Sequence, residues 1–195
     1  NLIISGGALR YTGGDTTTDR GFTVGGAGAT IDNASNLTFT GQILSTGTGS
    51  FTKNGAGTLA FTNITGTNTF TGGNSGNSLG LVVNNGLLQL GGTSASPLAQ
   101  TNQITGELII GTVNNASSPN AAMEINGGTT TITSYVGIGR GNGTNNAATS
   151  LTLNNNAVVT AGNFAIGYNN GVAGSSSSPT ADFNRTSTFS SAGGV

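Results

Sequence analysis

The side chains of this chain that could perform acid–base chemistry are its carboxylates, of which there are six in 195 residues. Glycoside-cleaving enzymes place two acids on either side of the scissile bond, because charge develops at the sugar ring in the transition state. One group is close in sequence, namely Asp15, Asp19 and Arg20 in TGGDTTTDR. The other acids are far apart, and they are Asp32, Glu107, Glu124 and Asp182. Aspartates in such stretches commonly accept turn hydrogen bonds, so the sequence favours a solvated loop over a catalytic centre.

The chain contains neither histidine nor cysteine. Without histidine it lacks the commonest catalytic base and metal ligand, and without cysteine it lacks disulfides and thiolate metal sites. We therefore predict no catalytic, cofactor-binding or metal-binding residues, no cofactor, and a protein that is not an enzyme.

Two glycine-rich segments resemble ligand-binding motifs but lack the residues that do the binding. In Gly25–Ile31, Thr30 stands where the calcium-binding nonapeptide repeat has its aspartate ligand, and no tandem copy follows. In Gly137–Gly143 (GIGRGNG), neither a following helix nor an acidic residue about 20 positions further on completes a nucleotide-binding loop. Both segments are predicted to be structural turns.

Threonine pairs at alternate positions would form an ice-binding array if they shared one flat face of strands. The pairs are Thr38/Thr40, Thr69/Thr71 and Thr131/Thr133. Threonine is also the favoured outward residue on an exposed strand, and the T-x-T pattern is not regular along the chain. The sequence therefore favours ordinary exposed strands.

Charge is sparse, with 6% charged residues and a net charge of −1. The basic residues are scattered, and they are Arg10, Arg20, Lys53, Arg140 and Arg185. Since no basic cluster could follow a phosphate backbone, nucleic acid is not an expected partner. Glycosylation sequons permit surface sugars without showing them, at Asn33, Asn36, Asn63, Asn115, Asn142 and Asn184.

The elements that carry these residues repeat. An apolar strand stops at an Ile-Gly pair at three places 28 residues apart, Ile110-Gly111, Ile138-Gly139 and Ile166-Gly167. The match extends upstream, where AAMEINGGTTTITSYVGIGRGNG aligns without a gap to TSLTLNNNAVVTAGNFAIGYNNG. A fixed period of this length is typical of repeat proteins, in which each unit buries its apolar face only against its neighbours. We therefore expect the three isoleucines to stack over one another.

Short apolar runs bounded by Gly and Asn recur along the chain without a sustained 3.6-residue period, so we expect strands and essentially no helix. Asn-Gly dipeptides between these runs predict corners, since both residues tolerate positive φ. They are Asn54-Gly55, Asn85-Gly86, Asn126-Gly127, Asn142-Gly143 and Asn170-Gly171. Longer polar stretches predict loops at 72–78, 93–103, 113–120 and 172–179. No apolar run approaches the 18 to 20 residues of a membrane span.

Three short segments within 49–92 follow one another in a characteristic order. They are Lys53–Leu59 (KNGAGTL), Asn68–Gly73 (NTFTGG) and Gly86–Gly91 (GLLQLG). This order resembles the autotransporter-associated β-strand repeat of bacterial surface proteins, with Phe70 where that repeat usually has Tyr. The resemblance implies an extracellular passenger region that folds as a right-handed parallel β-helix, in which the repeat serves export and structure and contributes no catalytic residues.

These patterns predict an all-β, right-handed parallel β-helix (β-solenoid) of about eight coils that rises about 4.8 Å per coil. We expect a single domain over 1–195, with the repeat at 49–92 and coils of 28-residue period over 106–195, as a segment or repeating unit of a longer array. The expected function is architectural and extracellular, as a fibre, stalk or passenger segment of a bacterial cell surface. The alternative is an adhesin that binds carbohydrate or host surfaces through loops 93–103 and 172–179. A β-helix polysaccharide lyase or hydrolase ranks third.

Both ends of the chain have the character of uncapped strand edges. Leu2–Ile4 is apolar at once, and Ala192–Val195 opens another strand-like run. Unpaired edges are templates for further pairing, and the low charge leaves little repulsion between copies. We therefore expect end-to-end self-association or continuation of the same polypeptide, with surface glycans as the other candidate partner.

Overall fold

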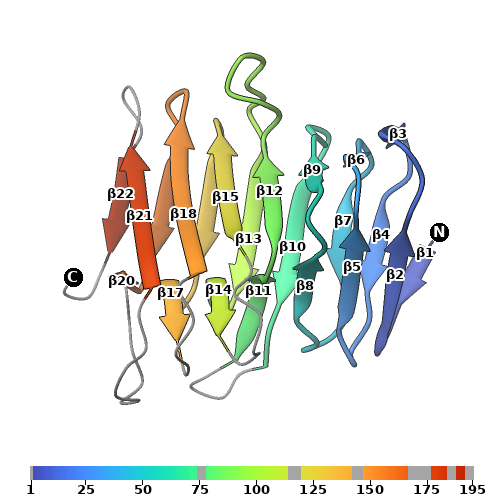
Figure 1. The fold of residues 1–195 in the computed structure, drawn as a ribbon, viewed down its shortest axis with the longest axis horizontal. Coiled ribbons are helices and arrows are strands. Elements are labelled where there is room, and N and C mark those ends of the chain that lie inside the picture. The colour runs from blue at the N-terminus through green and yellow to red at the C-terminus, as the bar shows by residue number, and fades with distance from the viewer. Residues whose placement is uncertain are drawn as a thin grey trace.

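The computed structural model describes residues 2–73, 78–113, 120–141, 147–166, 177–183 and 188–191, and this part of the chain contains strands and no helix. The strands recur in groups of three, and strands three places apart in the sequence pair in parallel, except for β7 and β10, which belong to separate sheets. The groups follow one another along the long axis, from blue to red in Figure 1. The all-β class and the parallel pairing predicted from the sequence are confirmed, and the arrangement is consistent with a β-helix or solenoid.

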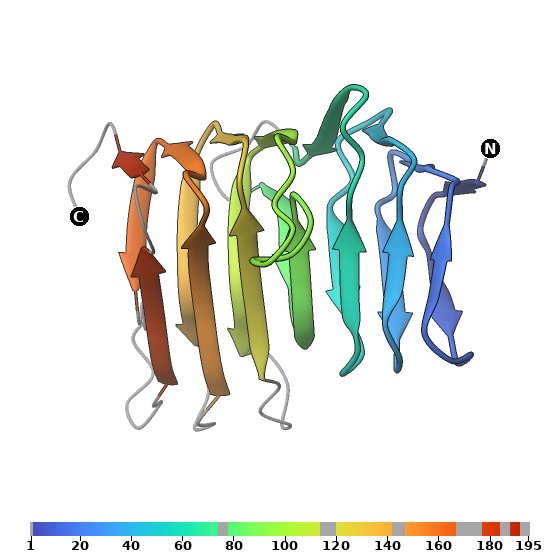
Figure 2. The ribbon, with the colours of Figure 1, turned by 90° about the horizontal axis from the view of Figure 1, so that it is seen from above.

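The first strands of the groups form two sheets, β1 (Leu2–Ile4), β4 (Phe22–Val24) and β7 (Ile43–Ser45), and then β10 (Thr67–Thr71), β13 (Thr101–Thr105), β16 (Thr129–Ile132), β19 (Val158–Ala161) and β22 (Thr188–Ser191). The second strands form one sheet of β2 (Gly7–Tyr11), β5 (Ala29–Asn33), β8 (Phe51–Asn54), β11 (Leu79–Val83), β14 (Glu107–Val113), β17 (Tyr135–Gly141) and β20 (Asn163–Ile166). The third strands form one sheet of β3 (Thr16–Thr18), β6 (Leu37–Phe39), β9 (Thr58–Phe61), β12 (Gly86–Leu90), β15 (Ala121–Asn126), β18 (Ala147–Asn154) and β21 (Ser177–Phe183). Figure 2 shows successive groups side by side with nearly parallel strands.

The register confirms the predicted isoleucine stack. Ile110 pairs with Ile138, and Ile138 pairs with Ile166, in β14, β17 and β20. Ile110 and Ile138 are fully buried, whereas Ile166, in the last described strand of this sheet, is 46% exposed. The 28-residue spacing in the sequence therefore corresponds to one step along the sheet.

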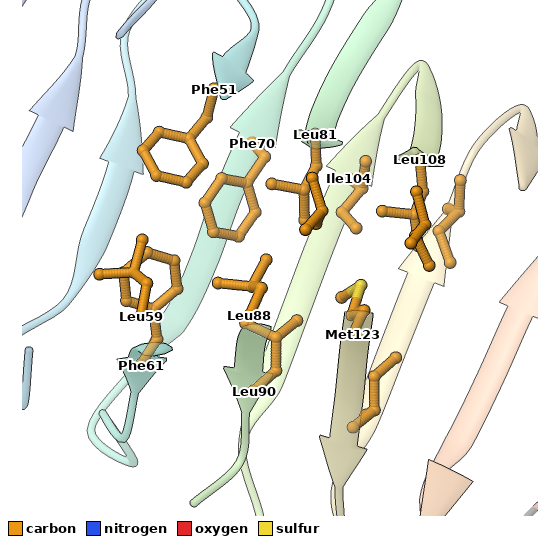
Figure 3. Close-up of a cluster of buried hydrophobic side chains, with 14 of the residues drawn as sticks. Phe51, Leu59, Phe61, Phe70, Leu81, Leu88, Leu90, Ile104, Leu108 and Met123 are labelled. Carbon is orange, nitrogen blue, oxygen red and sulfur yellow. The ribbon is translucent and has the colours of Figure 1, made fainter. Parts of the chain in front are cut away.

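The core is a narrow column of inward side chains contributed by all the sheets. Each strand points alternate residues inward, so two or three apolar positions per strand suffice to fill it. Phenylalanine rings fill one stretch of the column, where Phe61 lies 5.8 Å from Phe51, 5.9 Å from Phe70 and 6.2 Å from Phe39 between ring centroids. Leucine, isoleucine and methionine continue the column beyond the rings, as Figure 3 shows.

Corners and loops agree with the sequence only in part. Gly55 and Gly86 lie at corners with φ of 79° and 71°, as the Asn-Gly pattern predicts, but the pairs 142–143 and 170–171 lie outside the described residues. The predicted loop 93–103 is too long, because Thr101 already begins β13. The loops 72–78 and 113–120 include undescribed residues.

The predicted loop 172–179 is wrong at its end, because β21 begins at Ser177 and includes Pro179. Proline lacks the N–H that a central strand needs, so it predicts a break in a strand. Here β21 is the outermost strand of its sheet in the described chain, and an edge strand tolerates proline. No helix in the described residues has the length and apolar character to cross a membrane.

We expect Phe61→Ala to lower the free energy of unfolding by about 3–5 kcal/mol, because it leaves a cavity among four rings. Ile64→Ala is the matched control, since Ile64 is 61% exposed at the following corner and its truncation opens no cavity. Urea unfolding followed by circular dichroism measures both. Equal effects of the two substitutions would contradict the packed column.

Candidate functional site

Asp15, Asp19 and Arg20 are exposed, as expected for a solvated loop, and Asp15 also makes a contact with the next group of strands. Asp15 accepts hydrogen bonds on both carboxylate oxygens from Asn36, from its backbone N–H at 3.0 Å and from its Nδ2 at 2.9 Å. The backbone N–H of Arg20 donates to Thr18 Oγ1 at 3.3 Å. In the described part of the chain no ion pair joins Asp19 to Arg20. The group is therefore not assembled as a pair of free acids with a cationic neighbour.

The remaining acids lie on other strands, two on the second sheet and two on distant strands of the third sheet. Asp32 pairs in register with Arg10, with 4.0 Å between Oδ2 and Nε, and both side chains are exposed enough for the pair to contribute little stability. Glu107 is buried at the start of β14. Glu124 of β15 lies in register with Thr152 of β18, and Thr152 lies in register with Asp182 of β21, whose side chain is outside the described residues. The sequence reading missed this alignment of Glu124 with Asp182, because it requires the strand register.

Glu124 belongs to a polar network with amide side chains. Its Oε2 accepts hydrogen bonds from Gln89 Nε2 at 2.9 Å and Asn126 Nδ2 at 3.2 Å. Asn126 Nδ2 also donates to Gly92 O at 2.9 Å, and its Oδ1 accepts from Asn154 Nδ2 at 2.8 Å. The network links three successive strands of the third sheet, and through Gly92 it holds the base of the loop after β12.

The glycine-rich segments lie on strands and corners. Gly28 has φ of 85° directly before β5, and Thr30 lies within β5 beside Thr52 of β8. Among the described residues no group of three or more Asp or Glu side chains could hold a metal ion. Residues 137–141 of the second segment belong to β17, and 142–143 lie outside the described residues.

Among the described residues, the ionisable side chain whose pKa is clearly shifted is Lys53, which the sequence analysis placed among the scattered basic residues. Lys53 pairs with Ile31 on one side and Val83 on the other, so it occupies an inward position in an apolar column, and it is fully buried. Its Nζ donates to Asn54 O at 2.7 Å, Gly55 O at 2.7 Å and Asn85 O at 3.0 Å. The lysine of the KNGAGTL segment therefore closes the corner after β8 and ties it to the corner after β11.

The charge on Lys53 is costly at this position. Burial lowers the pKa of Lys53 from 10.5 to about 8, and the Asp32 carboxylate opposes that shift. Lysines with lowered pKa also occur at catalytic sites, where they face a cleft and act as nucleophiles or bases. All three partners of this amine are backbone carbonyls, and the side chain has no exposure to a substrate. The geometry is that of a buried clamp.

The NTFTGG segment has a structural role at the junction of the first two sheets. Strands β7 and β10 belong to separate sheets, and side chains link them. Ile43 N–H donates to Asn68 Oδ1 and Ser45 N–H to Thr69 Oγ1, each at 2.9 Å. Ser45 Oγ–H also donates a hydrogen bond to Thr69 O at 2.9 Å. The Asn-Thr pair of the segment therefore takes the place of a backbone ladder.

Two of the sequons fall on asparagines with structural roles. Asn33 is fully buried, and its Nδ2 donates to Ser35 O and Thr58 O at 2.8 and 2.9 Å. Asn63 is 1% exposed, whereas Asn36 is exposed and bonded to Asp15. The sequons at 115, 142 and 184 lie outside the described residues.

The described part of the chain is thus an all-β protein of parallel strands whose motif residues act as structural contacts. Over 78 residues the chain is 49% identical to the Adhesin BmaC autotransporter of Brucella suis biovar 1 (strain 1330), and the match covers 38% of this chain. The chain spans about 2% of the length of that adhesin. No family model matches the chain, and no solved structure matches it. The similarity is therefore to an autotransporter adhesin, and the specific repeat family is not confirmed.

We expect Lys53→Met to lower the free energy of unfolding by about 2–4 kcal/mol near neutral pH, because three buried carbonyls lose their donor. Thr52→Ala is the matched control, one residue away on the outward side of β8. Chemical unfolding of both variants measures the effect. A Lys53→Met protein as stable as the native one would contradict the clamp.

The lowered pKa of Lys53 also predicts a pH dependence. Below about pH 8 the amine is charged in both the folded and unfolded chains, so the full cost of burying the charge is present. Between about 8 and 10.5 the unfolded chain binds the proton that the folded chain has lost, so stability rises with pH. We expect the native protein to gain stability relative to Lys53→Met across this range. A constant difference would show that the carbonyl cage keeps the proton bound.

Proposed function

We propose that this chain is a passenger segment of an autotransporter-type bacterial surface protein, located outside the cell, with an architectural and non-catalytic role. In this proposal the segment is a right-handed parallel β-helix of about eight coils. The observation that carries it is the three-strand register, which continues through the motif segments that resemble the repeat. The identity to an autotransporter adhesin supports the surface location.

The roles of the motif residues support an architectural function. Lys53, Asn68 and Thr69 are engaged with backbone groups of adjacent coils, and Asp15 is held by Asn36. In a protein whose coils contact only their neighbours, such links set the coil spacing over the whole length. A rod of this kind holds a distal part of the protein away from the cell.

We also propose that another β-coil, from the same polypeptide or from an identical copy, covers the free edges of β1, β2 and β3. Each of these strands has a described partner on one side, and Ile3 in β1 is 66% exposed. Open strand edges readily accept a further strand. Electron microscopy of the native material, with the full-length gene sequence beside it, separates stacked copies from one long polypeptide.

The alternative function is adhesion to surface glycans through the loop after β12. Gly92 and Pro97 form an antiparallel bridge at its base, and Asn155 Nδ2 donates to Ser94 O at 2.8 Å. The loop is therefore held against corners two groups further along the chain. A held loop loses less conformational entropy on binding than a free one. The second predicted loop, 172–179, is undescribed up to residue 176.

We expect intact cells that express the full-length gene to lose this segment on mild protease treatment, since the proposal places it outside the cell. An epitope tag inserted at Ile64, an exposed corner, reports the loss by immunoblot. A cytoplasmic protein serves as the control for cell integrity. Protection of the tag until the cells are lysed would contradict the surface location.

Binding to a glycan array separates the two functions. Saturable binding that is lost when residues 93–99 are replaced by a short Gly-Ser turn would favour the adhesin. The control is the unfolding midpoint of the loop variant, which must equal that of the native protein to show that the strands are unchanged. Absence of binding to any sugar leaves the architectural role as the better account.

A further inference from the structure

A regular array of threonines covers the outward side of β10, β13 and β16. Three successive strands, together with Thr133 directly after β16, present nine outward positions in a three-by-three arrangement, and eight of them are threonine. The rows across the strands are Thr67–Thr101–Thr129, Thr69–Gln103–Thr131 and Thr71–Thr105–Thr133. All nine are exposed or half-buried, and the residues between them are buried. We call these nine residues the threonine grid.

The structure combines two of the three threonine pairs that the sequence singles out. Thr69/Thr71 and Thr131/Thr133 belong to the grid, and Thr38 lies on β6 of another sheet. The sequence hides the array because Thr67 and Thr101 are 34 residues apart, whereas Thr101 and Thr129 are 28 apart. The next strand, β19, continues the outward pattern with Val158 and Thr160.

A ladder of polar side chains behind the grid fixes its register. Asn68 Nδ2 donates to Asn102 Oδ1, and Asn102 Nδ2 donates to Thr130 Oγ1, each at 3.2 Å. These three residues are buried, and a slip of one strand would break both bonds. Threonine is also stiff at χ1, since its Cβ is branched. The hydroxyl and methyl groups of the grid are therefore held in a rigid pattern.

The grid is uncharged and its hydroxyls are largely unused. Strands β10, β13 and β16 contain no charged residue, and Phe70, their one aromatic residue, is buried. Thr69 Oγ1 and Thr133 Oγ1 accept backbone hydrogen bonds at 2.9 Å. In the described part of the chain the hydroxyls of six grid residues make no hydrogen bond, and these are Thr67, Thr71, Thr101, Thr105, Thr129 and Thr131.

The spacings of the grid can be compared with those of tetrahedral water. Adjacent strands are about 4.8 Å apart, and alternate residues along a strand are about 6.7 Å apart. Oxygen atoms joined tetrahedrally by hydrogen bonds of about 2.75 Å repeat every ~4.5 Å in one direction and every ~7.3 Å perpendicular to it. Each spacing of the grid lies within about a tenth of the corresponding repeat. Hydroxyls held this way can anchor water in positions that continue into an ice lattice.

We propose that the threonine grid is an ice-binding surface. Its hydroxyls hydrogen-bond an ordered layer of water, and its methyl groups lie between the rows of that layer. The neutral face fits an occupant without charge, and the repeat in two directions fits a crystal. The proposal goes beyond the architectural function, and it assigns to one face of the rod the ability to attach to frozen surfaces.

Two other occupants fit the grid less well. A second copy of the chain has the same strand spacing, but even the five-stranded sheet that carries the grid offers only about 350 Å². Stable interfaces need about 800 Å² from each partner. A neutral polysaccharide would lie on a face without an outward aromatic ring, since Phe70 points into the core.

The test uses the whole chain and compares Thr131→Tyr with Thr38→Tyr. Thr131 lies within the grid, whereas Thr38 is an outward threonine on β6 between Thr17 and Ala60. The measurements are thermal hysteresis and the partition of the protein into a slowly growing ice front. We expect the native chain and Thr38→Tyr to partition into ice, and Thr131→Tyr to lose about tenfold or more, because a bulky side chain lifts the lattice off the grid.

Thr101→Tyr on β13 is the second grid variant, so a folding defect in one variant does not decide the result. Circular dichroism and the unfolding midpoint show which variants are folded. Failure of the native chain to shape ice overturns the proposal, as does equal behaviour of the grid variants and Thr38→Tyr. Two further outcomes also overturn the proposal, if Thr131→Tyr leaves ice binding unchanged. Dimers of the native chain in sedimentation that are lost in Thr131→Tyr would assign the face to a second copy. Retention of the native chain on cellulose that is lost in Thr131→Tyr would assign the face to a polysaccharide.

Discussion

The rest of the structure depends on parallel backbone pairing between strands three places apart in the sequence. This pairing brings equivalent positions of paired strands within about 4.8 Å of each other. A side chain in a central strand therefore lies next to the side chains at the same position in the two neighbouring strands. One group of three strands cannot cover its own inward apolar side chains. It becomes stable only by stacking, and the column of Phe61, Leu88 and Met123 runs through several coils for that reason.

Stacking alone does not fix the register, since a column of aliphatic side chains can slide. Polar groups inside the column supply the missing specificity. Lys53 replaces an aliphatic residue between Ile31 and Val83, and its amine reaches carbonyls that only one alignment provides. The Asn68–Asn102 bond does the same in the sheet that contains β10 and β13. Buried polar groups of this kind cost desolvation energy, and they favour one arrangement because every other leaves them unpaired.

Much of this organisation could be predicted from the sequence, because the signals are local. Alternation within short runs predicts strands, and the 28-residue period predicts that Ile110, Ile138 and Ile166 stack, which the register confirms. The Lys53 clamp could not be predicted in this way, since nothing in the sequence shows that a lysine points inward. The threonine grid could not be predicted because the spacing from β10 to β13 is 34 residues, whereas the spacing from β13 to β16 is 28. The register depends on the number of residues in each connection between strands, and this number is known only once the strands are placed in the structure.

The division between inward and outward positions explains how one scaffold can carry different surfaces. Inward residues are constrained by stacking and by the buried ladders, so most of them are apolar along the described strands. Outward residues are less constrained by packing. Those at equivalent positions of paired strands line up in a row across the sheet. The third sheet carries Gln89, Glu124 and Thr152 in such a row. The sheet that contains β10, β13 and β16 carries rows of threonines. A change of a few outward side chains therefore alters the chemistry of a whole face while the column behind it, and hence the fold, stays the same.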